Sequence, residues 1–88
     1  MFKWIVIDVE PRTDYTLLIT FAKGKKRVFD CKKFLFDEDF FEEIKNLDFF
    51  MKARADHHTV MWSENLDISP EYLYKNSIKE KKHRNLFL

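Results

Sequence analysis

The side chain best suited to nucleophilic chemistry is Cys31, the only cysteine in the sequence. A single cysteine excludes a disulfide within the chain. A cysteine nucleophile needs a nearby base or a positive field, and the two lysines that follow Cys31 are expected to be solvated. A cysteine at a strand end is more often a small apolar side chain. The sequence therefore predicts no catalytic cysteine.

A metal site is the chemistry that Asp56 and the pair His57-His58 suggest. Adjacent histidines on a strand point to opposite faces, although a turn can gather them. His83 lies far off in the sequence, and no spacing matches a closed zinc site. A polar hairpin turn is the simpler interpretation, so we predict no metal and no cofactor.

Acid–base chemistry is suggested by an acidic run. Its members are Asp37, Glu38, Asp39, Glu42 and Glu43. Paired carboxylates serve as acid and base only when they are held in a dry cleft. These residues surround an expected helix start, where carboxylates are favoured by the helix dipole. We therefore predict no catalytic residues and expect that the protein is not an enzyme.

Two basic patches offer contacts to a partner. The first is the tip of an expected hairpin, with Lys23, Lys25, Lys26 and Arg27, and the second is a C-terminal stretch with Lys81, Lys82, Arg84 and the apolar Phe87. Such patches can bind phosphate in a salt-dependent way, but no recognition helix or RNA-binding motif accompanies them. Lysines also protect edge strands from aggregation.

The composition favours one small folded domain. The chain has 88 residues, a formal net charge of +1, and an aromatic set of ten Phe, two Trp and three Tyr that can fill a core. No apolar run approaches the length of a membrane span, and the first residues do not form a signal peptide. We expect a cytoplasmic protein with no membrane partner.

Period-two patterns place three strands in the first part of the chain. They cover residues 2–9, with Ile5, Ile7 and Val9 on one face, then 15–21 and 27–30. A turn is expected at residues 11–14. Gly24 is expected to take a positive φ in a loop of two or three residues, so the register between the second and third strands is left open.

Period 3.6 begins at Asp39 and predicts a helix to Leu47, with Phe40, Ile44, Leu47 and Met51 on its apolar face. A second hairpin, 53–56 and 59–62, surrounds His57-His58 and leads to Trp62, which we expect to be buried with its indole N–H bonded. Ser69-Pro70-Glu71 then opens a short helix.

These elements predict an α+β fold in the order β-β-β-α-β-β-α, with a small antiparallel sheet packed against a helix. A single domain is expected over residues 1–76. Residues 77–88 are expected to form a basic C-terminal tail with an apolar end. That tail is expected to be ordered by docking on its own domain or on a second copy.

Two further patterns carry a resemblance over about residues 3–75. Phe21, Gly24 and Asp30 form one, and Leu47, Asp48, Trp62, Asp67, Ile68, Pro70, Leu73 and Tyr74 form the other. They resemble the bacterial domain-of-unknown-function family 2442. The family's proline after Trp62 is Ser63 here, and its glycine before the aspartate is Asn65 or Leu66. Asp30 and Asp67 stand beside turns, where an Asx turn is the simplest role.

The resemblance implies a role in protein interaction, because members of that family are often encoded beside small toxin-like proteins. Some members also carry a C-terminal helix-turn-helix. The leading hypothesis is a non-enzymatic interaction module, an antitoxin-like partner of a small toxin-like protein or a homo-oligomer. The alternative is a nucleic-acid-binding accessory protein that uses the basic hairpin and tail.

Overall fold

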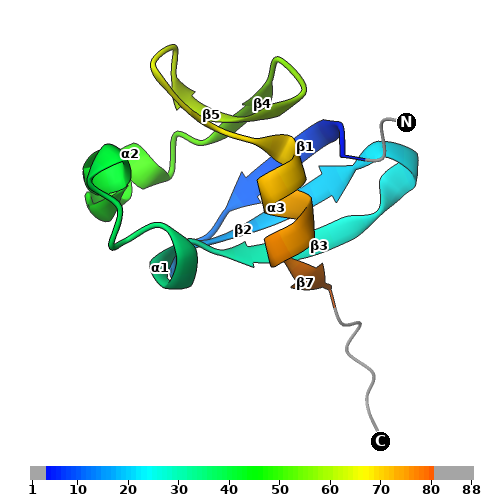
Figure 1. The fold of residues 1–88 in the computed structure, drawn as a ribbon, viewed down its shortest axis with the longest axis horizontal. Helices are drawn as coiled ribbons and strands as arrows, with labels where there is room; N and C mark the ends of the chain where they lie inside the picture. The colour runs from blue at the N-terminus through cyan, green and yellow to red at the C-terminus, as the bar shows by residue number, and fades with distance from the viewer. Residues whose placement is uncertain (1–3, 81–88) are drawn as a thin grey trace, which may run out of the picture.

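The protein folds around two antiparallel sheets, shown in a computed structural model that describes residues 4–80 (Figure 1). The larger sheet has the order β1-β2-β3-β7, with β1 (Val6–Pro11), β2 (Thr16–Phe21), β3 (Lys26–Asp30) and β7 (Ile78–Lys79). The smaller has the order β4-β5-β6, with β4 (Arg54–Asp56), β5 (Thr59–Ser63) and β6 (Leu66–Ile68). The predicted α+β class is confirmed, although β6 and β7 were not expected as strands.

The inner face of the larger sheet follows the predicted alternation in β2, where Leu17, Ile19 and Phe21 are fully buried. In β1 the prediction for Ile7 is wrong. The pairing of β1 with β2 shifts between Val6 and Asp8, so Val6 is buried and Ile7 is 57% exposed. An irregularity of this kind inserts an extra residue and moves the following side chains to the opposite face.

The turns differ in detail from those expected. Pro11 pairs with Leu17 inside the sheet, and the first turn runs from Arg12 to Tyr15, whose N–H donates to the Arg12 carbonyl over 2.9 Å. Between β2 and β3 the connection is η1 (Ala22–Gly24) followed by Lys25, which is longer than two or three residues. Gly24 has the predicted positive φ, at +78°.

The helices are short: α1 (Cys31–Phe34), the 3-10 helix η2 (Asp39–Lys45), α2 (Leu47–Phe50) and α3 (Pro70–Asn76). The prediction of one helix from Asp39 to Leu47 is wrong. The backbone at Asn46 is extended, and the Asn46 side chain accepts a hydrogen bond from the Phe49 N–H, so a new helix begins there. Asp39 is the first residue of η2, and no side chain caps this helix.

The altered helix changes which side chains are buried. A 3-10 helix has three residues per turn, so an apolar stripe at 3.6-residue spacing does not remain on one face. Ile44 is buried, but Phe40 is 63% exposed, and Leu47 and Met51 are also exposed. The predicted apolar face of this segment is therefore wrong apart from Ile44.

One core fills the space between the inner face of the larger sheet, the helices and the smaller sheet. Its largest fully buried side chains are Phe21, Phe29 and Phe50. Helix α3 lies across the larger sheet (Figure 1), and its Leu73 is fully buried. Strand β7 pairs with β3 beyond residue 76, so sheet pairing extends to Lys79. No helix within residues 4–80 is long and apolar enough to cross a membrane.

Candidate functional site

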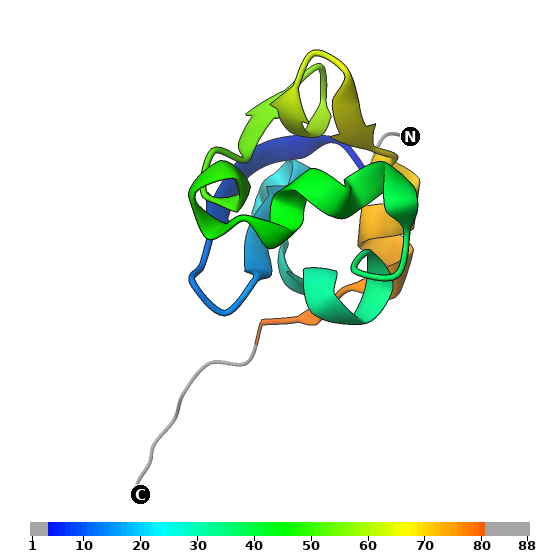
Figure 2. The same ribbon diagram turned by 90° about the vertical axis from the view of Figure 1, so that its left-hand side faces the viewer.

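An open groove of about 450 Å³ lies where the segment linking α1 to η2 meets the end of β6 and the start of α3. Figure 2 shows η2 and α1 on the face toward the viewer, with α3 beside them. Aromatic rings form much of the lining, and two of these are exposed at the surface: Phe40 at 63% and Tyr72 at 40%. Exposed large apolar side chains that gather at a concave surface are typical of interaction sites.

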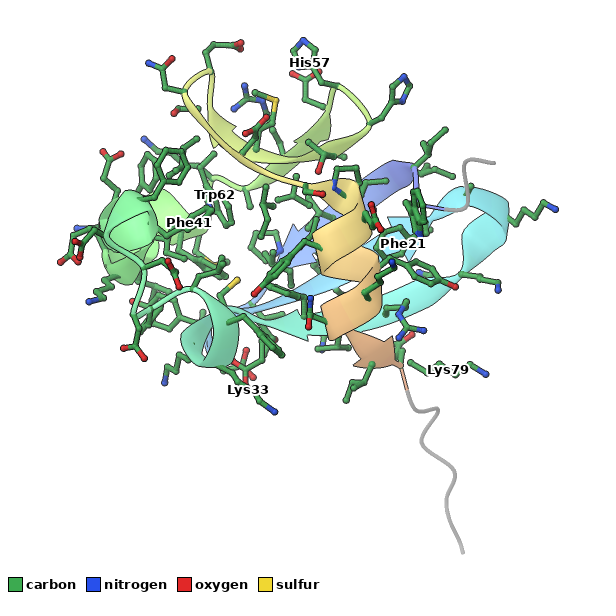
Figure 3. All side chains as sticks on the ribbon, in the orientation of Figure 1. Phe21, Lys33, Phe41, His57, Trp62 and Lys79 are labelled. Carbon is green, nitrogen blue, oxygen red and sulfur yellow. The ribbon has the colours of Figure 1, made fainter. Side chains whose placement is uncertain are left out.

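The rings of the groove are held by contacts with the core. The Phe40 ring packs edge-on against the Phe41 ring, with 5.0 Å between the ring centroids. Phe41 packs in the same way against the buried Trp62, with 6.1 Å between centroids. Figure 3 shows Phe41 and Trp62 next to one another. On the other wall, Phe34 contacts Tyr72 at 6.3 Å. The groove is therefore supported by packed rings on both walls.

Two carboxylates give the groove its charge. Glu38 precedes η2, Asp67 lies in the middle of β6, and both are exposed. Within residues 4–80 neither carboxylate forms an ion pair with a lysine, arginine or histidine. An apolar surface with open carboxylates suits a ligand that carries both apolar and cationic groups.

The two aspartates beside turns take different roles. Asp30 accepts hydrogen bonds from the backbone N–H groups of Lys32 and Lys33, at 3.1 and 3.3 Å, and so caps α1 as an Asx-type turn. The same expectation for Asp67 is wrong, because Asp67 is a strand residue paired with Met61 and its side chain accepts no hydrogen bond within residues 4–80. Asp67 lines the groove instead.

The remaining motif residues are structural. Trp62 is 3% exposed, and its indole N–H donates to the Phe50 carbonyl, so both parts of that prediction are confirmed. Pro70 is the first residue of α3, whose cap Ser69 accepts from the Tyr72 N–H at 3.3 Å. Asp48 lies in the first turn of α2, and the Tyr74 ring packs edge-on against Phe21 at 5.0 Å.

The basic hairpin residues separate into two groups. Lys23, Lys25 and Lys26 are exposed at the tip. Arg27 points inward, where its Nε and Nη2 donate to the hydroxyl and the carbonyl of Ser77 at 2.8 and 2.6 Å. Its guanidinium also lies 4.7 Å from the centre of the Tyr74 ring. These contacts use two of the five N–H donors of Arg27 and hold its side chain against Ser77 and Tyr74.

The candidate chemical groups are not gathered into one site. Cys31 is fully buried, and burial raises the pKa of its thiol far above the ordinary value, with the Asp30 carboxylate as a second cause. His57 and His58 form the two-residue turn between β4 and β5, with φ of 51° and 66°. Within residues 4–80 no three metal-binding side chains are grouped to hold an ion.

The groove itself was not predicted from the sequence. The available signal was the pair Phe40-Phe41 in the middle of the acidic run, since aromatic residues are costly to expose among solvated charges. The predicted helix from Asp39 to Leu47 already accounted for Phe40 as part of its apolar face, so the pair did not indicate a surface site. Lys81, Lys82, Arg84 and Phe87 of the expected tail lie outside the described residues.

Residues 4–80 thus define a small α+β domain with two antiparallel sheets and an open, ring-lined groove. The chain belongs to the family described as Protein of unknown function (DUF2442), whose pattern matches residues 6–79. This match confirms the resemblance carried by the Trp62 and Pro70 motif. No curated protein and no solved structure matches the chain.

Proposed function

We propose that the protein is a non-enzymatic interaction module, and that the groove binds a segment of another protein that carries cationic and apolar side chains. The observation that supports this proposal is the exposure of Phe40 and Tyr72 on a surface that also holds Glu38 and Asp67. Aromatic residues supply much of the energy of protein interfaces when a partner removes them from water.

The charge of the groove defines the chemistry of the partner. A lysine or arginine gains from the open carboxylates of Glu38 and Asp67, while an apolar side chain gains from the aromatic rings of the same groove. We propose a small protein in the cytoplasm as the source of this segment. A toxin-like neighbour is the candidate that the family resemblance implies, with this chain as the antitoxin-like partner.

The test uses Phe40→Ala with Ile7→Ala as the matched control. Both side chains are large, apolar and mostly exposed, at 63% and 57%, but Ile7 does not line the groove. Tagged versions of the full chain are expressed in the native host, crosslinked partners are identified by mass spectrometry, and the affinity of each purified partner is then measured. We expect Phe40→Ala to weaken binding about tenfold or more, and Ile7→Ala to leave it unchanged.

Asp67→Lys adds a test of charge. Asp67 makes no side-chain hydrogen bond within residues 4–80, so its replacement leaves the fold intact while reversing one charge of the groove. Weaker binding of the same partner is expected. A partner that binds the Phe40 and Asp67 variants as well as the unaltered chain contradicts the proposal.

A second candidate function is nucleic-acid binding, and the pairing of β7 with β3 favours it. This pairing places Lys79 opposite Arg27, and the Glu80 N–H donates to the Lys26 carbonyl at 3.2 Å. Lys79 is therefore a neighbour of the basic hairpin. Binding of this kind falls steeply with salt. A gel shift that is lost in high salt and in a Lys23→Ala, Lys25→Ala, Lys26→Ala variant supports it, and no shift at low salt contradicts it.

A further inference from the structure

The sequence contains a segment with the chemistry that the groove is suited to bind. Residues 81–88 read Lys-Lys-His-Arg-Asn-Leu-Phe-Leu, with the cationic side chains first and the apolar ones after them. The groove offers Glu38 and Asp67 to cations, and Phe40 and Tyr72 to apolar side chains. We infer that the groove binds residues 81–88 of a second copy of this chain. The inference rests on the proposed function, because it names a partner for the same groove.

The path of the chain favours a second copy over the same molecule. Strand β7 runs antiparallel to β3, and Glu80 lies beside Lys26 at the start of β3. The groove lies beyond the other end of β3, where Asp30 leads into α1 and Phe34. The chain therefore passes Glu80 while heading away from the groove.

The length of residues 81–88 also favours binding to a second copy over binding to the same molecule. Eight residues span at most about 28 Å when fully extended. To reach its own groove, the segment must reverse direction beside Glu80 and run back past Ile78, which lines a neighbouring hollow together with Phe34. The residues used in this reversal cannot contact the groove. A groove on a second copy imposes no such path.

Charge near Glu80 also opposes docking close to the segment's own start. Lys25, Lys26 and Lys79 are exposed around that point. Further cations are repelled there, whereas Glu38 and Asp67 attract them at the groove. If each of two copies gives its segment to the other, the contact is the same in both directions and closes as a symmetric dimer.

The experiment uses the full chain in three forms. The first is unaltered, the second is the groove variant Phe40→Glu, and the third is the segment variant Leu86→Ser, Phe87→Ser, Leu88→Ser. Circular dichroism verifies that each is folded, and sedimentation measures its mass. We expect the unaltered protein to approach twice the chain mass of 10.8 kDa as concentration rises. Each variant alone is expected to dimerise about tenfold or more weakly.

Mixing the two variants distinguishes exchange between copies from docking within one copy. The segment variant keeps an intact groove, and the groove variant keeps an intact segment, so the mixture is expected to form a one-sided dimer. A labelled peptide of residues 81–88 is expected to bind the segment variant and not the groove variant. Ile7→Ser is the control, since Ile7 is exposed outside the groove, and it is expected to dimerise normally.

The outcomes separate this inference from the proposed function. An unaltered protein that stays monomeric, or a mixture that does not associate, overturns the second-copy inference. Peptide binding that still depends on Phe40 then leaves the proposed function standing. If the Phe40 variant binds the peptide, the second copy and the host partner as the unaltered chain does, both proposals are overturned.

Discussion

The indole N–H of Trp62 donates a hydrogen bond to the backbone carbonyl of Phe50 over 3.0 Å. This bond joins β5 to the end of α2, and the two rings also pack at 6.2 Å. Because the Trp62 ring also packs against Phe41, the same residue supports the ring-lined groove from the core. Core stability and the shape of the groove therefore depend on one side chain.

Replacing Trp62 tests this arrangement. Trp62→Ala is expected to lower the free energy of unfolding by about 3–5 kcal/mol, because it removes a buried ring. Trp62→Phe keeps most of the apolar contact but removes one of the two hydrogen bonds to the Phe50 carbonyl, which also accepts from the Ala53 N–H, so a loss of about 0.5–1.5 kcal/mol is expected. Urea unfolding measures both. A loss below about 1 kcal/mol for Trp62→Ala contradicts the assignment of Trp62 to the core.

Asp30 and Asp67 provide a matched pair. Asp30→Ala removes the cap of α1 and is expected to cost about 0.5–2 kcal/mol, while Asp30→Asn retains an acceptor and is expected to cost less. Asp67→Ala is expected to change stability by less than about 0.5 kcal/mol, because Asp67 is exposed and caps nothing. Thermal unfolding of the three variants measures the difference. Equal losses for Asp30→Ala and Asp67→Ala argue against the capping role.

The buried thiol makes stability depend on pH in alkaline solution. Burial raises the pKa of Cys31, so the folded state stays protonated while the unfolded chain ionises above about pH 8.5. The contribution of this group is therefore fully present below that pH and is lost as pH rises. Its slope approaches about 1.4 kcal/mol per pH unit.

Cys31→Ala is the control for that prediction, because it keeps every other titrating group. The difference in unfolding free energy between the unaltered protein and Cys31→Ala is expected to fall as pH rises from about 8 to about 10. Native alkylation of Cys31 is expected to be slow over the same range. Fast alkylation of the folded protein, or a constant difference, contradicts the burial of this thiol.

The turn residues allow a test in both directions. His58 has φ of 66° and carries a side chain, so His58→Gly is expected to stabilise the protein by about 0.5–1 kcal/mol. Gly24 has φ of +78°, and an added Cβ meets nothing within 4 Å, so Gly24→Ala is expected to cost about 1 kcal/mol through backbone strain alone. Chemical denaturation measures both. Shifts of the opposite sign contradict the turn conformations.

The sequence predicted the fold best where one local pattern controls the structure. Alternation in β2, the Ser69-Pro70 start of α3 and the hairpin around His57 are local signals, and each is confirmed. The prediction of one helix from Asp39 to Leu47 was wrong because the Asn46 side chain accepts a backbone hydrogen bond and caps a new helix. The spacing of apolar residues does not include this competing hydrogen bond. The burial of Val6 in place of Ile7 depends on a register shift that β1 does not encode by itself.

The groove was harder to predict than the core. Its walls come from two stretches that are far apart in the sequence, residues 34–41 and 67–72, and the exposure of Phe40 depends on the 3-10 geometry of η2. Asp67 was singled out in the sequence but was predicted to form an Asx turn. Its actual position in β6 depends on pairing with Met61, which the local sequence does not reveal. Sites built from distant segments depend on tertiary packing, which single-sequence patterns do not contain.

Most strand pairings described within residues 4–80 join strands that are neighbours in the sequence. The pairing of β3 with β7 is different, because β7 comes from the far end of that range. A chain made from its N-terminus can close its hairpins early, since pairing over short separations is fast. Until residues 77–79 are synthesised, β3 has a bare edge and Arg27 lacks Ser77. During translation, the edge of β3 therefore stays open to strand-to-strand association with another chain until β7 has paired with it.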